Sequence, residues 1–329
     1  MDGFLWVEAQ PGRPYLTLAT QEGRILQWNL VVGGVRQLAQ TGQLVQTRWS
    51  PDGNWLVAVL RQGQALFFDE SGLQRDSLAQ PLETLCGACF DGSRLALGGH
   101  RDGAACALVG EMKGGWRQDY EVLCPAAQEV RSLVLHQDTL VLGCEDGFFE
   151  AYRRKGQENP AGGQVFSGAV GAMALSPERT HLAMGGSRGG MLTMTMDPWV
   201  VADSWPRVPP RPIAVNQLSF AREQLWAACS DDCARAYAWP KPEMDSRLGT
   251  PFWVRSPKPE WSREMIIASL CVLGNRLYLA HYFGGLSIWD ITRQVCLGTL
   301  TIDGSGHWKL GDEEGQGENP SRLWQQLHA

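Results

Sequence analysis

The chain has 329 residues, of which 44% are apolar and 19% are charged, and its net charge is −6 at pH 7. The apolar content and the 14 Trp residues argue against disorder over most of the length, and the acidic balance gives no basic surface for nucleic acid. No apolar run reaches the roughly 18 residues that a transmembrane helix needs, so we expect no membrane insertion.

A strand–turn unit recurs along the chain, and its clearest copy runs from Trp49 to Asp69. An apolar strand ends in a Pro-Asp-Gly turn, a second apolar strand ends in a polar residue and Gly63, and a third strand follows. Equivalent hairpins are centred at positions 23, 63, 103, 147, 189, 232 and 284. The residue five positions after each centre is apolar, and these residues are Trp28, Phe68, Leu108, Tyr152, Met194, Tyr237 and Trp289.

The spacing of these hairpins predicts the fold class. Six of the seven centres are Gly, which adopts the positive φ of a tight turn without strain, and the exception is Asp232. Short β-runs at regular intervals with almost no helical signal indicate an all-β repeat protein. A four-stranded unit of about 40 to 45 residues is the size of a propeller blade, so we expect seven four-stranded antiparallel blades in a β-propeller.

The phase of the repeats suggests how the ring closes. We interpret Phe4–Ala9 as the second strand of a blade that lacks its innermost strand, and residues 294–302 as one further innermost strand. This C-terminal strand would join the first blade and complete it, which removes open sheet edges. The predicted propeller therefore spans residues 1–302.

Residues 303–329 are predicted to form a flexible tail rich in Gly and acidic residues. Ser321 is suited to cap a short helix that presents Leu323, Trp324 and Leu327. Two interpretations of this tail stay open. It is either a solvated extension of the propeller or a linear motif that docks on a partner.

Three sequence patterns carry a resemblance to a known family. They are Trp-Ser-Pro-Asp-Gly at 49–53, Leu-Ala-Xaa-Gly-Gly at 95–99 and 182–186, and Leu-Ser-Ile-Trp-Asp at 286–290. Over roughly residues 4–302 the chain resembles the WD-repeat propellers, with kelch propellers as the second choice because of the paired glycines. Trp289-Asp290 is the only literal Trp-Asp at a strand end, and the Gly-His that opens a typical repeat is missing from its expected places, since it occurs only after a third strand, at 99–100, and in the tail, at 306–307. The family's polar network is therefore not carried over, and apolar packing between blades must supply the stability.

Two long connections, residues 197–214 and 240–264, distinguish the blades from one another. Both follow what we interpret as a blade's outer strand, so both should emerge on one face over blades five to seven. They are rich in Trp and Arg, the residue types enriched at interface hot spots. With Trp324 of the tail, the candidate protein-binding residues are Trp199, Trp205, Arg207, Arg211, Trp253, Arg255, Trp261 and Arg263. The alternative is that Trp205 and Trp253 lie in inner strands and fill the core.

Catalytic and metal-binding motifs are not apparent. The six His have no metal-ligand partner at short spacing, and no nucleophile elbow or phosphate-binding loop is present. The nine Cys lie mostly in apolar runs, and the N-terminus does not look like a secretory signal, so we expect buried free thiols, a cytoplasmic protein and no cofactor. We expect a non-catalytic scaffold, itself monomeric, that binds one or more proteins within a larger complex. The alternative is an enzyme or small-ligand binder with its site in the central channel.

Overall fold

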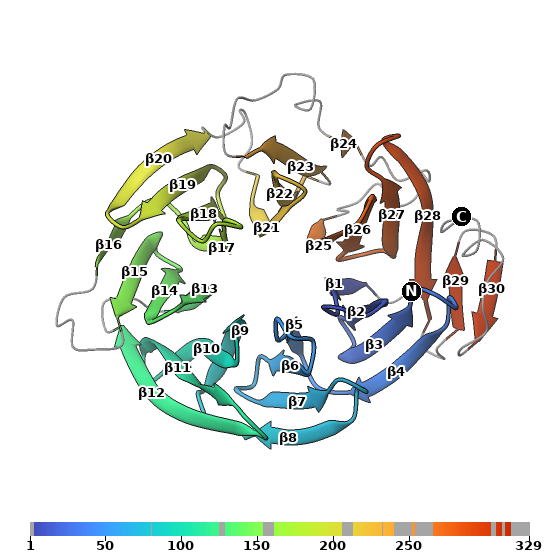
Figure 1. Cartoon of the computed structure of the whole chain (residues 1–329), viewed down its shortest axis with the longest axis horizontal. Helices are drawn as coiled ribbons and strands as arrows, with labels where there is room; N and C mark the ends of the chain where they lie inside the picture. Colours follow the sequence, from blue (N-terminus) through green and yellow to red (C-terminus); the bar gives the residue numbers. More distant parts are fainter. Residues whose placement is uncertain are drawn as a thin grey trace.

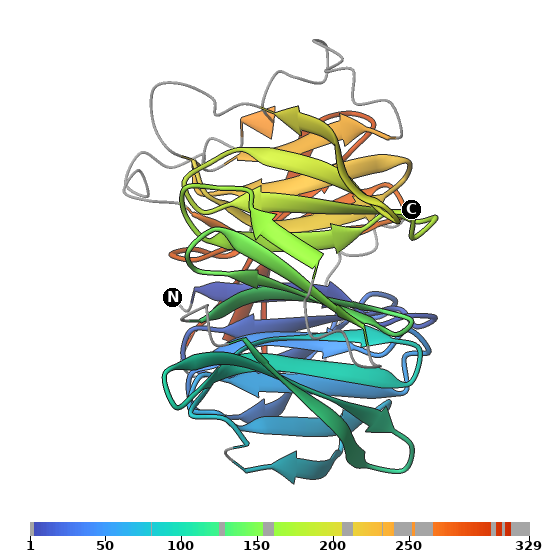
Figure 2. The same ribbon diagram turned by 90° about the vertical axis from the view of Figure 1, so that its left-hand side faces the viewer.

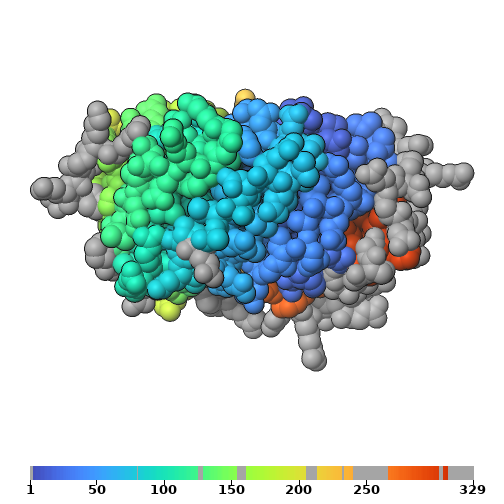
Figure 3. All heavy atoms as spheres, turned by 90° about the horizontal axis from the view of Figure 1, so that it is seen from below, coloured from blue at the N-terminus to red at the C-terminus, as the bar shows by residue number. Residues whose placement is uncertain are grey.

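The computed structural model describes residues 3–79, 81–124, 129–153, 161–205, 213–231, 233–239, 252–253, 266–303, 307–310 and 313–316. These residues form seven antiparallel sheets arranged as blades around a central axis (Figure 1). The blades form a thick disc when seen from the side (Figure 2), and those of the N-terminal half make a continuous rim (Figure 3). The predicted seven-bladed propeller is confirmed. No helix in the described part of the chain is long and apolar enough to cross a membrane.

Each blade takes its strands consecutively from the chain, from the innermost strand outward. Blades one to three are β1 (Phe4–Ala9), β2 (Tyr15–Thr20), β3 (Arg24–Asn29), β4 (Val35–Gln40); β5 (Leu44–Trp49), β6 (Trp55–Leu60), β7 (Ala65–Asp69), β8 (Gln74–Leu78); and β9 (Thr84–Asp91), β10 (Arg94–Arg101), β11 (Ala104–Met112), β12 (Trp116–Cys124). Blades four and five are β13 (Val130–His136), β14 (Thr139–Cys144), β15 (Phe148–Arg153), β16 (Ala161–Gln164); and β17 (Val170–Leu175), β18 (His181–Gly186), β19 (Met191–Met196), β20 (Trp199–Trp205). Blades six and seven are β21 (Val215–Ala221), β22 (Gln224–Cys229), β23 (Cys233–Ala238), β24 (Phe252–Trp253); and β25 (Ile267–Leu273), β26 (Arg276–His281), β27 (Leu286–Asp290), β28 (Val295–Ile302). The last sheet continues with β29 (His307–Leu310) and β30 (Glu313–Gln316).

The second–third hairpins of blades one to five each have a glycine at positive φ, at positions 23, 63, 103, 147 and 189. Gly63 has φ +80°, and a Cβ there would lie 2.0 Å from the carbonyl oxygen of Leu82 in the next blade. Only glycine satisfies both the backbone conformation and this close approach. The hairpin glycine therefore serves the turn and also the packing of neighbouring blades.

Neighbouring blades meet through close packing of an inner strand on the second strand of the preceding blade. A Cβ at Gly98, Gly143 or Gly185 would lie 3.0, 2.8 or 2.5 Å from a Cγ1 atom of Val130, Val170 or Val215, respectively. Each valine is the first residue of an inner strand, and it fills the space that the glycine leaves open. Small and large side chains thus interlock at these blade boundaries.

The expected ring closure by strand exchange is wrong. β1 is the innermost strand of blade one, and β28 pairs with β27 as the fourth strand of blade seven. Blade one has no vacancy to fill, because Phe4–Ala9 to Val35–Gln40 already supply its four strands. The ring closes by side-chain packing, in one apolar cluster that joins blade one to blade seven. Val7 also donates its backbone N–H to Ser269 Oγ across this boundary, at 2.7 Å.

Ordered structure continues beyond the predicted propeller boundary at Ile302. β29 pairs with the end of β28, and Trp308 on β29 is only 3% exposed because it packs into the cluster between blades one and seven. Residues 303–310 therefore include a fifth strand that supports the closure. The predicted short helix and Trp324 lie outside the described residues.

Candidate binding site at the mouth of the central channel

A β-bulge at the start of every inner strand shapes the central channel. In each blade the pairing of the first and second strands skips one residue of the inner strand. The skipped residues are Leu5, Val45, Cys86, Arg131, Gly171, Asn216 and Ala268. All of them line one cavity of about 400 Å³ at the centre of the ring. A bulge redirects a side chain away from the regular alternation, so the seven bulges together form the wall of this cavity.

The cavity lies toward one face of the disc. Because the first and second strands are antiparallel, each inner strand begins beside the second–third turn of its own blade. We call this face, with its inner-strand starts and second–third turns, the mouth face. Tyr282, which belongs to the second–third turn of blade seven, also lines the cavity.

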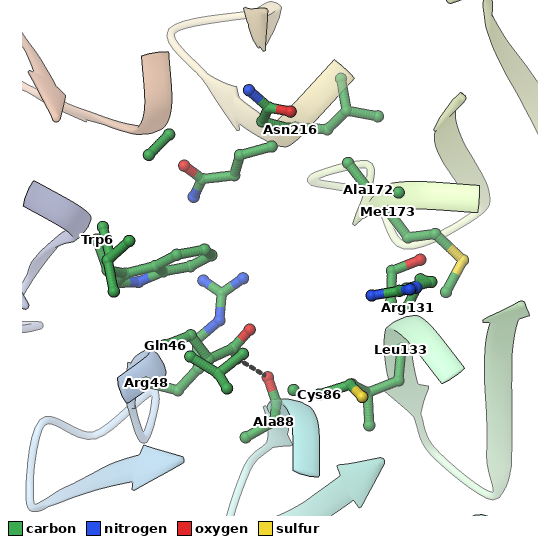
Figure 4. Close-up of a pocket in the computed structure, with 18 of the residues that line it drawn as sticks. Trp6, Gln46, Arg48, Cys86, Ala88, Arg131, Leu133, Ala172, Met173 and Asn216 are labelled. Carbon is green, nitrogen blue, oxygen red and sulfur yellow. Dashed lines mark hydrogen bonds between the residues drawn. The ribbon is translucent and has the colours of Figure 1, made fainter. Parts of the chain in front are cut away.

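Uncharged polar side chains in the cavity wall link neighbouring blades. Gln46 donates to the carbonyl oxygen of Ala88 in the next blade at 2.7 Å, as Figure 4 shows. Ser132 and Asn216 donate to the carbonyl oxygens of Val170 and Ile267, both at 2.7 Å. These groups satisfy backbone acceptors on the adjacent inner strands, so their first role is structural.

Arg48 is the most distinctive polar group in the cavity. Its guanidinium carbon lies 4.8 Å from the ring centre of Trp6, and it points toward the middle of the cavity in Figure 4. Glu8 Oε1 is 3.5 Å from a guanidinium nitrogen of Arg48. Burial raises the pKa of Glu8 to about 7, although the charge of Arg48 opposes this shift. Near neutral pH, Glu8 is therefore only partly ionised and neutralises only part of the Arg48 charge.

Arg131 reaches the cavity from blade four with its charge already balanced. It lies 3.1 Å from Glu129 Oε2 and 2.9 Å from Glu145 Oε1. The Cys86 thiol donates to Glu129 at 2.9 Å, and burial together with this hydrogen bond raises the pKa of Cys86 to about 12. A thiol with that pKa is protonated at neutral pH and is a poor nucleophile.

Two exposed aromatic residues stand at the edge of the cavity. The side chains of Tyr282 and Phe283 are 37% and 54% exposed, and their rings meet edge to face at 4.7 Å. The carbonyl oxygen of Tyr282 accepts a hydrogen bond from Gln21 Nε2 of blade one, so the backbone of this turn is held in place. The equivalent turns of the other blades carry polar residues before the turn centre. This contrast was visible in the sequence, but the prediction used Phe283 only as a hairpin marker.

The predicted Trp and Arg residues fall into three groups. Trp199 is half-buried and its ring lies 5.7 Å from that of Phe149, so it packs between blades four and five. Trp205 and Trp253 belong to the outer strands β20 and β24, which corrects the alternative that placed them in inner strands. The remaining predicted residues lie outside the described part of the chain; they are Arg207, Arg211, Arg255, Trp261, Arg263 and Trp324.

The interpretation of residues 197–214 and 240–264 as connections after an outer strand is also wrong. This interpretation takes β19 and β23 as the outer strands of their blades, whereas each is the third strand. Trp199–Trp205 supplies the fourth strand in blade five, and Phe252–Trp253 supplies it in blade six by pairing with Cys233 and Ala234. β24 divides the second segment, so that segment cannot be treated as one loop on one face.

Among the described residues that line the cavity, none is Asp, Glu or His. Across the described part of the chain, no three His, Cys, Asp or Glu side chains are placed to hold a metal ion. The described lining therefore consists of apolar, uncharged polar and arginine side chains, which are suited to binding.

Comparisons with known proteins identify the fold. No protein-family model and no curated protein matches the sequence. A chain of the mitotic checkpoint complex is similar in structure, with a TM-score of 0.64 and 17% identity over 81% of this chain and 80% of that chain. The computationally designed protein Ika8 is similar with a TM-score of 0.59 and 14% identity, over 94% of this chain and 93% of that chain. Saccharomyces cerevisiae Sqt1 is similar with a TM-score of 0.58 and 10% identity, over 85% of this chain and 94% of that chain. At these identities the likeness is one of fold.

Proposed function

We propose that the chain is a non-catalytic interaction scaffold that resembles the WD-repeat propellers and binds one or more protein partners through its mouth face. The main support is the exposed pair Tyr282 and Phe283 beside a cavity with no described acid or His in its lining. Exposed aromatic side chains on a rigid support are typical of interface hot spots. One similar structure comes from a protein assembly, the mitotic checkpoint complex, which agrees with this class of function.

The residues predicted from the sequence extend this proposal. Trp205 ends β20 beside the start of β19, and Trp253 ends β24 beside the start of β23, so both strand ends are at the mouth face. All nine cysteines are free thiols, which suits a reducing, cytoplasmic environment. The alternative of a catalytic channel finds no Asp, Glu or His among the described lining residues.

Affinity capture with the full chain, followed by mass spectrometry, tests this proposal. We expect the double variant Tyr282→Ser and Phe283→Ser to lose a partner that the natural chain captures, with its melting temperature unchanged. Val31→Ser with Val32→Ser is the matched control, because these residues are 67% and 44% exposed in a third–fourth turn on the opposite face. Equal partner recovery by both double variants and by the natural chain would refute a mouth-face interface.

A further inference from the structure

Arg48 carries a cationic charge that the structure leaves partly unbalanced inside the channel. Its side chain is 31% exposed, and its buried Nε has no hydrogen-bond partner among the residues that the structure describes. Because this Nε is inaccessible from the cavity, a ligand carboxylate would pair with the exposed part of the Arg48 side chain, whose charge Glu8 neutralises only in part. Arg131, the other cation of the cavity, already has two carboxylates within 3.1 Å. The two arginines are therefore not equivalent, and Arg48 is the one suited to take an anion.

The surroundings of Arg48 strengthen an interaction with an anion. The guanidinium carbon of Arg48 lies 4.8 Å from the ring centre of Trp6, which is a cation–π contact, while Leu133 and Met173 contribute apolar surface to the same cavity (Figure 4). A planar guanidinium presents two parallel N–H donors to a carboxylate, and partial exclusion of water makes such a pair stronger than at an open surface. Glu8 competes only weakly with a ligand carboxylate for Arg48, because the Glu8 carboxyl, whose pKa is raised to about 7, is close to half protonated near neutral pH.

The rim of the cavity indicates what carries the anion. Tyr282 both lines the cavity and packs against Phe283, so an exposed apolar surface continues directly from the cavity wall. A small free anion would leave this surface uncovered. A peptide would cover it, because an apolar side chain next to an acidic one can lie on the two rings while the acidic side chain enters the cavity.

We propose that the channel mouth binds a partner segment in which a Glu or Asp side chain pairs with Arg48 and an adjacent apolar side chain packs on Tyr282 and Phe283. This inference rests on the proposed scaffold function and deepens it by naming the chemistry of the partner. In this arrangement Arg48 selects partners with an acidic side chain, and Tyr282 and Phe283 in the turn of blade seven select partners with an adjacent apolar side chain.

The test uses fluorescein-labelled pools of hexapeptides in which a central pair is fixed and the other positions are random. One pool fixes Phe and Glu in either order, a second replaces the Glu by Gln, and a third replaces the Phe by Ser. Fluorescence anisotropy with the full chain measures each Kd. We expect the Phe–Glu pool to bind about tenfold or more tightly than the Phe–Gln pool, and about threefold or more tightly than the Ser–Glu pool.

Variants of the protein supply the second half of the test. Arg48→Gln should remove the preference for Glu over Gln, and Arg48→Lys should restore part of it because the charge is kept. Arg75→Gln is the matched control and should leave every Kd unchanged, since Arg75 lies on outer strand β8 and pairs with Asp69 at 2.6 Å. If Arg48→Gln does not fold, the comparison of the three pools on the natural chain still decides the matter.

Three results would overturn the inference. They are equal Kd values for the Glu and Gln pools, no binding of any pool up to roughly 1 mM, and competition by N-acetylglutamate as strong as that by the peptide itself. The last result would identify a site for a small carboxylate. Partner capture that is lost in the Tyr282 and Phe283 variant but kept in Arg48→Gln would leave the scaffold function standing and refute the role of Arg48.

Discussion

Replacing Trp308 by Ala should destabilise the ring at its closure. The ring closes without strand exchange, so side-chain packing stabilises the contact between blades one and seven. Trp308 lies in this cluster at 3% exposure, beside blade-one residues such as Trp28 and blade-seven residues such as Tyr278. Removing a buried aromatic side chain costs about 3 to 5 kcal/mol, because apolar burial is lost and a cavity remains. Against a typical total of about 5 to 15 kcal/mol, such a loss is easily measured.

Denaturant unfolding gives the size of this loss, and hydrogen exchange with mass spectrometry gives its location. We expect faster exchange in β1, β2 and β26 to β28, and unchanged exchange in β14 and β18, on the far side of the ring. Trp116→Ala is the matched control, because Trp116 stacks on Phe67 at 6.2 Å between blades two and three. It should raise exchange in those blades instead. A loss below about 1 kcal/mol for Trp308→Ala, or an even rise in exchange around the ring, would refute closure by this cluster.

Two further predictions concern pH and packing. Because the folded-state pKa of Glu8 is raised to about 7 from an ordinary value of 4.5, folding takes up a proton between these pH values, and the free energy of unfolding should fall by about 3 kcal/mol as pH rises through this window. Unfolding at pH 5 and pH 8 should show a flatter dependence for Glu8→Gln, and an unchanged dependence would contradict the assignment. Gly185→Ala should lower the free energy of unfolding by about 1 to 3 kcal/mol, because its Cβ would lie 2.5 Å from Val215 Cγ1. Adding Val215→Ala to Gly185→Ala should recover part of the lost stability. Gly163→Ala is the control and should cost little stability, because its Cβ would meet no atom within 4 Å. Equal losses of stability at Gly185 and Gly163 would argue against the packing explanation.

The hairpins could be predicted because their signal is local. Each turn glycine lies between two apolar strands. Around Gly63 and Gly147, for example, the turn and both strands fall within fewer than twenty residues. The outer strands have no comparable signal. Gln74–Leu78 is almost entirely exposed, and Ala161–Gln164 reads Ala-Gly-Gly-Gln, so neither has the apolar alternation of a buried strand. The expectation that residues 197–214 form a connection has a different origin, because it takes β19 as the outer strand of its blade.

The phase of the ring and the channel lining could not be read from the sequence. The first and second strands of a blade are both apolar, so the pattern of Phe4–Ala9 does not reveal which of the two it is. Bulges arise from the pairing of two strands, and nothing local to Cys86 or Arg131 marks them. A chain of hydrogen-bonded polar side chains in blade seven was also not predicted from the sequence. There Trp289 donates to Ser287 Oγ at 3.0 Å, and His281 lies 2.8 Å from the same oxygen.

The bulges explain how one scaffold can hold a selective site without loss of stability. At the equivalent position the seven blades carry Leu, Val, Cys, Arg, Gly, Asn and Ala, yet the surrounding backbone pairing is the same. A bulged side chain that makes no contact with the next blade can vary in size and charge at little energetic cost, whereas Asn216 also donates to Ile267 of blade seven. Arg48 lies three residues beyond the bulge of blade two and reaches the same cavity through its long side chain. The cavity wall thus combines residues that link the blades, such as Gln46 and Asn216, with residues such as Arg48 that can select a partner.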